Sequence, residues 1–230
     1  MKPTPSLPVI SVMLAALAAI AVASWVAWRW IGHGDTSARA GPGGVVQAEM
    51  DIGGPFTLTD HHGKTVTDKS FLGQYLLVYF GYGYCPDVCP TELANIAAAM
   101  DALGAKAGKV TPLFITVDPE RDTPAFLADY VANFYPRMIG LTGTPEQIKA
   151  VAKAYKVYYA KSKRPGEKEY LMDHTSFVYL MGPDGRFLSL FRGQTDPKAI
   201  AQAIAHIMAE HGAVTQRRPE AAPQSAQLRG

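Results

Sequence analysis

The chain has 230 residues, of which 48% are hydrophobic, so it can bury one sizeable core, and its length favours one domain over two. Its 22 basic and 20 acidic side chains give a net charge of +2 without a dense basic block, which argues against a nucleic-acid partner. The chain has only two cysteines, which excludes a small disulfide-built scaffold and leaves the fold to depend on its core.

The first predicted element is an apolar segment at residues 7–31, after a short N-terminal tail at 1–6. Its only charge is Arg29, and it exceeds the roughly 20 residues that cross a hydrocarbon layer. Small residues at 21–24 would suit cleavage of a signal sequence. However, apolar residues continue after them, and Trp25, Trp28 and Trp30 are placed as in the aromatic belt at a membrane interface. We therefore predict an uncleaved, single-pass transmembrane anchor in preference to a signal sequence, with the rest of the protein exported.

Three regions follow the predicted anchor. Residues 32–44 are rich in Gly and small residues and predict a flexible linker. Residues 45–212 predict one domain without internal repeats. Residues 213–230 are mostly polar, contain Pro, Gln and Arg, and show no apolar periodicity. This composition predicts a disordered tail.

The first half of the domain predicts strands that alternate with helices. Residues 55–73 alternate apolar and polar side chains around a DHHGK turn and predict a hairpin. The unbroken apolar runs at 75–82 and 110–118 predict strands buried on both faces. Between them, residues 91–108 have apolar side chains at helical spacing.

The second half predicts two helices, a hairpin and a last helix. Thr123 and Thr144 stand before prolines as candidate helix caps. Residues 175–191 predict a hairpin around a GPDGR turn, and residues 196–212 an amphipathic helix. This order indicates an α/β fold, a thioredoxin-like mixed sheet sandwiched by helices, with the N-terminal membrane anchor ahead of it.

Both cysteines, Cys85 and Cys89, lie between the strand at 75–82 and the helix that follows. In an open α/β sheet, reactive groups gather beyond the carboxyl ends of the strands, so this position favours a functional site. Cys89 precedes Pro90 at the helix start, where free backbone N–H groups and the helix dipole stabilise a thiolate. We therefore predict a lowered thiol pKa at Cys89.

The residues alone leave three uses of the cysteine pair open. A structural disulfide across so short a loop would remove little chain entropy. A dithiol redox pair is a second use, and a metal site is the third. Two thiolates suit Cu(I) or Zn(II), but a structural zinc site normally takes four protein ligands. The candidate third ligand is His174, although a histidine ahead of a strand is more often a hydrogen-bonded loop residue; His61 and His62, in the DHHGK turn, are expected to be solvated.

The stretch YFGYGYCPDVCPTEL resembles the copper-site motif of the Sco (SenC) family of copper chaperones. The stretches VDPERDTPAFLADYVANF, GLTGTPEQIKAVAKAY and DHTSFVYLMGPDGRF also resemble that family, in the same order along the chain. The resemblance implies a thioredoxin-like domain that binds one copper ion, Cu(I) or Cu(II), through Cys85, Cys89 and His174.

The resemblance also implies a biological role. By this resemblance the protein is expected to be a membrane-anchored metallochaperone and not an enzyme. It would deliver copper to the exposed copper centre of the copper-binding subunit of cytochrome c oxidase during assembly. An upstream copper carrier would load it. The expected location is a bacterial-type inner membrane, with the domain on the periplasmic side.

Some residues complicate this assignment. Gly83 stands where the family commonly has a threonine. Asp118, Arg121 and Asp122 are expected to form structural hydrogen bonds, with a role beside the metal as the alternative for Asp118.

The alternative function is a thiol-disulfide oxidoreductase that uses Cys85 and Cys89 to reduce the copper-site cysteines of the oxidase subunit. The VCPTEL stretch also resembles the peroxiredoxin motif, but Pro86 replaces the threonine that orients peroxide there.

Overall fold

A computed structural model describes residues 22, 24–25, 39–41, 45–47, 51–163 and 169–217. The chain divides into two compact units, 1–38 and 39–230. The predicted anchor at 7–31, apart from three residues, lies outside the described residues, as do the predicted tail at 1–6 and most of the linker. Within the part of the chain that is described, no helix is long and apolar enough to span a bilayer.

The larger unit is built on a mixed sheet, which has seven strands among the described residues, in the order β11-β10-β5-β6-β7-β3-β4. Strands β5, β6 and β7 are parallel, and the flanking strands pair antiparallel to them. The strands are β3 (Thr57–Asp60), β4 (Thr65–Thr67), β5 (Tyr75–Gly81), β6 (Val110–Thr116), β7 (Ile139–Thr142), β10 (Phe177–Met181) and β11 (Phe187–Arg192). Both predicted hairpins and both predicted central strands are confirmed.

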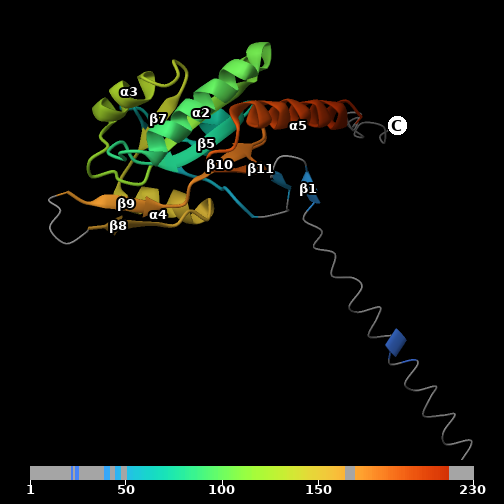
Figure 1. Cartoon of the computed structure of the whole chain (residues 1–230), viewed down its shortest axis with the longest axis horizontal. Coiled ribbons are helices and arrows are strands. Elements are labelled where there is room, and N and C mark those ends of the chain that lie inside the picture. The colour runs from blue at the N-terminus through green and yellow to red at the C-terminus, as the bar shows by residue number, and fades with distance from the viewer. Residues whose placement is uncertain are drawn as a thin grey trace, which may run out of the picture. The chain divides into compact units, whose positions relative to one another are not determined.

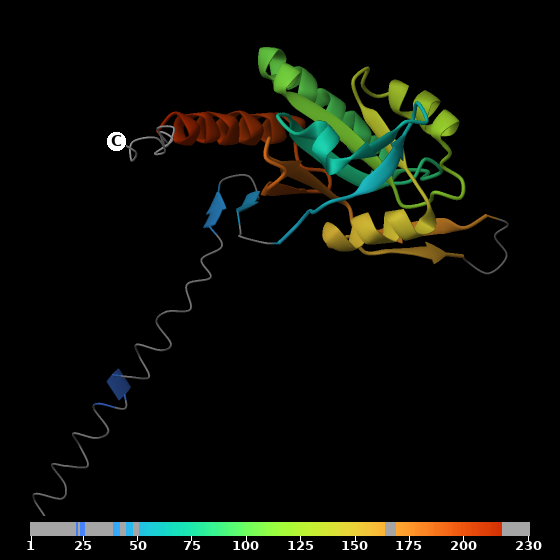
Figure 2. The same ribbon diagram turned by 180° about the vertical axis from the view of Figure 1, so that it is seen from behind.

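Helices cover both faces of this sheet, which confirms the predicted sandwich. Figures 1 and 2 show α2, α3 and α5 along one face and α4 on the other. The helices are α2 (Val88–Ala102), α3 (Pro124–Ala132), α4 (Pro145–Ala154) and α5 (Pro197–Arg217), with short 3-10 turns η1 (Asp68–Phe71) and η2 (Gly104–Lys109). The last helix ends at Arg217, so the prediction of a disordered tail was wrong for residues 213–217, which continue the helix, whereas residues 218–230 lie outside the described residues.

Two further strand pairs lie outside the main sheet. Strand β1 (Arg39–Gly41) pairs with β2 (Val45–Gln47), and β8 (Tyr159–Ser162) pairs antiparallel with β9 (Leu171–His174). The sequence did not predict the β8–β9 pair, which carries His174 at its end.

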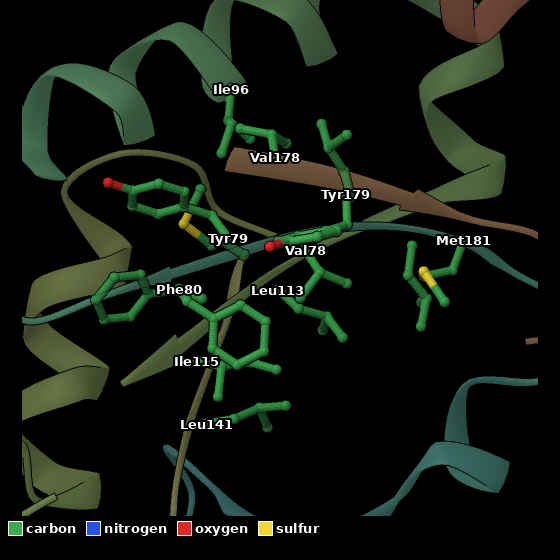
Figure 3. Packing of buried hydrophobic residues seen from close by; sticks show 14 of the residues in the cluster. Val78, Tyr79, Phe80, Ile96, Leu113, Ile115, Leu141, Val178, Tyr179 and Met181 are labelled. Atoms are coloured by element: carbon green, nitrogen blue, oxygen red, sulfur yellow. The ribbon is translucent and has the colours of Figure 1, made fainter. Parts of the chain in front are cut away.

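The core explains why β5 and β6 read as unbroken apolar runs. Every residue of β5 is buried, because its side chains point alternately into the two helical layers. Tyr79 packs near Phe114 on one face, whereas Phe80 packs against Tyr155 and Tyr179 on the other, with ring centroids 5.3 and 6.1 Å apart. Figure 3 shows Ile96 and Val178 close together on the α2 side of the sheet. Each such large apolar side chain contributes roughly 1.5–3 kcal/mol when fully buried.

The predicted helix caps are confirmed. Thr123 Oγ1 accepts a hydrogen bond from Phe126 N at 3.2 Å, and Thr144 Oγ1 accepts one from Gln147 N at 3.3 Å. Gln147 reaches back to Thr144 N at 2.8 Å and completes a capping box. These caps fix where α3 and α4 begin, and therefore fix the loop that leads from β6 into α3.

The two histidines of the β3–β4 turn differ. His62 is exposed as predicted, but His61 is half-buried and its Nδ1 accepts a hydrogen bond from Gly140 N at 3.0 Å, across to β7. The prediction of a solvated His61 was therefore wrong. A ring nitrogen that accepts a hydrogen bond has to be unprotonated, so the fold favours neutral His61. Burial, followed by the neighbouring His62, lowers the pKa of His61.

This arrangement predicts acid-sensitive stability. Because the folded-state pKa of His61 is lowered, its contribution is fully present above the unfolded pKa, near 6.5, and is lost as pH falls through the folded value. His61→Asn keeps an acceptor that does not titrate. Thermal unfolding at pH 7.5 and pH 5 should therefore show a larger loss of stability for the wild type than for His61→Asn, and His62→Asn, which removes only the weaker cause of the lowered pKa, should fall between them. Equal losses in wild type and His61→Asn would contradict the assignment.

Candidate functional site

The candidate site lies at the carboxyl end of β5, where the chain turns into α2. Gly81 closes the strand, and a Cβ there would lie 3.0 Å from Cys89 Sγ and 2.9 Å from the Phe114 ring. Only glycine lets α2 approach the strand end this closely. Cys89 consequently packs directly on the sheet and is fully buried.

The two cysteines are free thiols with unequal surroundings. Cys85 is half-buried, whereas Cys89 lies in the first turn of α2 and is buried. The backbone N–H of Cys89 donates to Cys85 Sγ at 3.3 Å, so the N-terminus of the helix points at the sulfur of Cys85 rather than at that of Cys89. Such N–H groups stabilise a thiolate.

The first proton therefore leaves Cys85. Hydrogen bonding with the Cys89 thiol, followed by hydrogen bonds from backbone N–H groups, lowers the pKa of Cys85 to about 3. The neighbouring Cys85 thiolate, helped by burial, raises the pKa of Cys89. The prediction of a lowered pKa at Cys89 was wrong, because the helix N-terminus acts on the other sulfur.

His174 lies beside these sulfurs at the end of β9. Its Nε2 is 3.4 Å from Cys89 Sγ, and its Nδ1 is 3.0 Å from the carbonyl oxygen of Thr175. A carbonyl oxygen only accepts, so this contact requires the hydrogen on Nδ1 and leaves the Nε2 lone pair facing the sulfur. The rings of Tyr79 and Tyr82 meet the imidazole edge-on, at centroid distances of 6.1 and 5.9 Å. The imidazole is thereby oriented as a ligand would be.

The donor set fits a soft metal ion. Two sulfurs and one unprotonated imidazole nitrogen suit Cu(I) or another thiophilic ion better than a hard, oxygen-seeking one. The fold brings together the three residues that the sequence predicted. In the described parts of the chain, however, no three His, Cys, Asp or Glu side chains already form a metal-holding group. Ligation by all three donors would therefore require a local adjustment.

A buried carboxylate supports the cysteine loop. Asp122 Oδ2 accepts hydrogen bonds from Gly83 N at 2.9 Å and from Thr116 Oγ1 at 2.5 Å. Burial raises the pKa of Asp122 to about 6. This confirms the structural hydrogen bonding expected of Asp122 and ties the loop to the end of β6.

Gly83 is explained by its neighbour. A Cβ at this position would lie 2.1 Å from a ring carbon of Phe126, so a threonine does not fit unless Phe126 moves. Tyr84 stacks on the same ring with a centroid distance of 5.0 Å and an interplanar angle of 10°. The ring of Phe126 thus fills the space next to the loop that a larger side chain at residue 83 would need.

A second group of residues lies between the cysteine loop and β9. Arg121 Nε donates to Asp118 Oδ2 at 2.5 Å, and Tyr170 Oη donates to Asp118 Oδ1 at 2.8 Å. Structural hydrogen bonds were predicted for Asp118 and Arg121, with a role beside the metal as the alternative for Asp118, whereas Tyr170 was not predicted. The available signal was spacing, because residues 170 and 174 are an even number apart and share one face of an extended segment.

Comparisons with known proteins agree with this arrangement. The SCO1/SenC family matches residues 45–209. The mouse (Mus musculus) protein SCO1 homolog, mitochondrial, is 48% identical over 163 residues, which are 70% of this chain and 57% of that protein. The chain thus spans little more than half the length of this relative.

Two solved structures share the fold. Arabidopsis thaliana ScoI with copper bound superposes with a TM-score of 0.66 and 42% identity, covering 69% of this chain and 99% of that one. BsSco, a protein with a disulfide switch in the Sco family of cytochrome c oxidase assembly proteins, has a TM-score of 0.55 and 29% identity, covering 70% of this chain and 94% of that one. These likenesses confirm the predicted thioredoxin-type α/β fold.

The unequal thiols can be tested by alkylation of the reduced, metal-free protein. With its pKa near 3, Cys85 is already a thiolate at pH 5, so its iodoacetamide labelling rate should barely change up to pH 7. An ordinary thiol would label about 100-fold faster at pH 7 than at pH 5. Fragment-ion mass spectrometry should locate the label on Cys85 and leave buried Cys89 unmodified. Preferential labelling of Cys89, or a steep rise with pH at Cys85, would contradict the assignment.

Proposed function

This chain belongs to the SCO1/SenC family, and we propose that it is a metallochaperone that carries one copper ion as cargo, held by Cys85, Cys89 and His174. The observation that carries the proposal is the contact between Cys89 Sγ and His174 Nε2 at 3.4 Å, with Nδ1 bonded to a carbonyl oxygen. A related protein, Arabidopsis ScoI, binds copper in a fold that matches this one. Two sulfurs and an imidazole are the donors that copper prefers.

The surroundings of the site suit transfer of the ion to another protein. Cys85 is only half-buried, and large apolar side chains are exposed next to the donors: Tyr84 is 51% exposed and Val88 is 39% exposed. Tyr158, 66% exposed, contacts the residue after His174 through hydrogen bonds in both directions with Thr175. A partner can therefore approach the site directly and replace the donors one at a time.

The proposed recipient is the copper-binding subunit of cytochrome c oxidase, with a separate carrier as the source of copper. Support comes from BsSco, which belongs to a family of cytochrome c oxidase assembly proteins. In this proposal residues 7–31 anchor the protein in a bacterial-type inner membrane, and 32–44 form the linker. The copper-binding domain lies on the periplasmic side, begins at residue 45 and includes α5 up to Arg217, and the tail follows at 218–230.

The chemistry assigned to the chain's own residues follows from their surroundings. Cys85 is the first thiolate available to an incoming ion, since its pKa is lowered. Cys89 has to lose its proton on binding, and the unprotonated Nε2 of His174 lies 3.4 Å from its sulfur. Protons compete with the ion for these donors, so copper affinity should fall as pH falls.

One observation favours a second function, thiol-disulfide exchange. Cys85 combines partial exposure with a lowered pKa, and Cys89 lies beside it with a retained proton. In this alternative the Cys85 thiolate attacks a disulfide of the oxidase subunit and one partner thiolate leaves. Cys89 then displaces the second partner thiol, so the partner gains two electrons and this chain becomes a disulfide.

Copper titration separates the two functions. The reduced protein should bind one Cu(I) under anaerobic conditions, and Cys85→Ala or Cys89→Ala should abolish that binding in a competition with a Cu(I) chelator. His174→Ala should weaken it by at least about tenfold, since one of three donors is lost. His62→Ala, which changes an exposed histidine of the β3–β4 turn, is the matched control and should bind like the wild type.

The same variants also show which results would contradict the proposed copper site. Unchanged copper stoichiometry and affinity in both cysteine variants would rule out the proposed site. Equal affinity of wild type and His174→Ala, together with rapid reduction of a disulfide substrate by both, would support the oxidoreductase instead.

A further inference from the structure

One side chain touches both of the segments that supply the proposed copper donors. Arg121 lies in the loop between β6 and α3, and its guanidinium carbon is 3.8 Å from the ring centroid of Tyr170, which directly precedes β9. The same carbon is 4.9 Å from the ring of Tyr84 and 6.0 Å from that of Tyr82, both in the cysteine loop. Arg121 therefore bridges the loop that carries Cys85 to the strand that carries His174.

Asp118 fixes this guanidinium and one of the rings at once. It is 1% exposed, and its two carboxylate oxygens accept hydrogen bonds from different partners, Arg121 Nε and Tyr170 Oη. The Arg121 side chain is 16% exposed, so this ion pair is mostly shielded from solvent. Stacking of a planar guanidinium on an aromatic ring adds an attraction that a lysine cannot reproduce in the same geometry.

A weaker contact ties β8 to the same loop. Lys161 Nζ lies 2.6 Å from Glu120 Oε2 and 4.7 Å from the Tyr170 ring centroid. Both charged side chains of this pair are about half exposed, and exposed ion pairs contribute little. Of the two charged contacts between the β8–β9 pair and the loop from β6 to α3, the one made by Arg121 with Asp118 is thus the better shielded.

At the opposite end of the β8–β9 pair, next to His174, two hydrogen bonds extend the pairing of the two strands. Thr175 N donates to the Tyr158 carbonyl oxygen at 2.9 Å, and Tyr158 N donates to Thr175 Oγ1 at 3.1 Å. Tyr170 therefore marks the end of β9 that Arg121 and Asp118 attach to the loop between β6 and α3, and His174 marks the end that contacts Cys89. A change at the Tyr170 attachment alters the path of the strand that presents the imidazole.

We infer that Arg121, held by Asp118, is a positioning residue that sets the placement of His174 relative to Cys85 and Cys89. The consequence for copper rests on the function proposed above, whereas the effect on the β8–β9 pair does not. Because the donors have to adjust to share one ion, the restraint from Arg121 limits how far the imidazole moves away from the sulfurs.

The test compares two small changes with a matched control. Arg121→Lys keeps the charge but loses the planar donor fork, and Tyr170→Phe keeps the ring but loses the hydroxyl that bonds to Asp118. Arg137→Lys is the control. The Arg137 guanidinium carbon also lies over a tyrosine ring, that of Tyr135 at 5.6 Å, and Arg137 Nη2 donates to the Ala107 carbonyl oxygen away from the site.

Three readouts are required, and the first of them is made without metal. In the metal-free protein, amide hydrogen exchange should become faster in β8 and β9 for Arg121→Lys and Tyr170→Phe, while β5 and α2 stay protected. Cu(I) affinity should fall by about tenfold in Arg121→Lys, the size typical of residues that orient a ligand. The thiolate-to-copper charge-transfer band of the Cu(II) form should shift, and none of these changes should appear in Arg137→Lys.

The other possible results also decide whether Arg121 positions His174. Exchange and affinity within twofold of wild type for Arg121→Lys and Tyr170→Phe would overturn the inference, as would equal losses in Arg137→Lys. A general fall in protection across the domain, without a shifted copper band, would assign Arg121 a structural role only. If the wild type bound no copper, the proposed function would fail, while exchange in the metal-free variants would still decide whether Arg121 positions β9. If Arg121→Lys did not fold, the milder Tyr170→Phe would decide all three readouts.

Discussion

The contact between Cys89 Sγ and His174 Nε2 joins two segments that are 85 residues apart, and the geometry of the site depends on it. Each partner is held independently. Cys89 is fixed by the close approach of α2 to Gly81, where no side chain larger than hydrogen fits. His174 is fixed by the Thr175 carbonyl oxygen and by two tyrosine rings. The fold thus supplies a sulfur and a nitrogen whose positions do not depend on a bound ion.

The pair of cysteines is electrostatically asymmetric, and this asymmetry serves either proposed function. The N–H of Cys89 at the start of α2 stabilises charge on Cys85, and burial together with the neighbouring thiolate keeps the proton on Cys89. For copper transfer, the more exposed thiolate meets the incoming ion first. For disulfide exchange, the same thiolate attacks and Cys89 resolves. Orientation of His174 toward the sulfurs favours copper, because exchange between thiols does not need an imidazole.

Sequence patterns predicted those parts of the fold that local physics determines. Unbroken apolar runs marked β5 and β6, and Thr123 marked the start of α3, because burial on both faces and capping leave local signatures. The β8–β9 pair was not predicted, since its residues are mixed in polarity and its attachment comes from Arg121, 49 positions before Tyr170 in the chain. The more acidic cysteine was misassigned because spacing does not reveal which sulfur the helix N–H groups face. The hydrogen bond between His61 and Gly140 was also missed, because it is a tertiary contact and sequence spacing does not reveal such contacts.

The most direct test of the account is X-ray absorption spectroscopy of the Cu(I)-loaded protein, because it counts the donor atoms around the ion. The account predicts two sulfur scatterers and one imidazole nitrogen in the wild type, with the nitrogen absent in His174→Ala and retained in His62→Ala. Two sulfur scatterers without nitrogen in the wild type, unchanged in His174→Ala, would contradict the central claim that His174 completes the site.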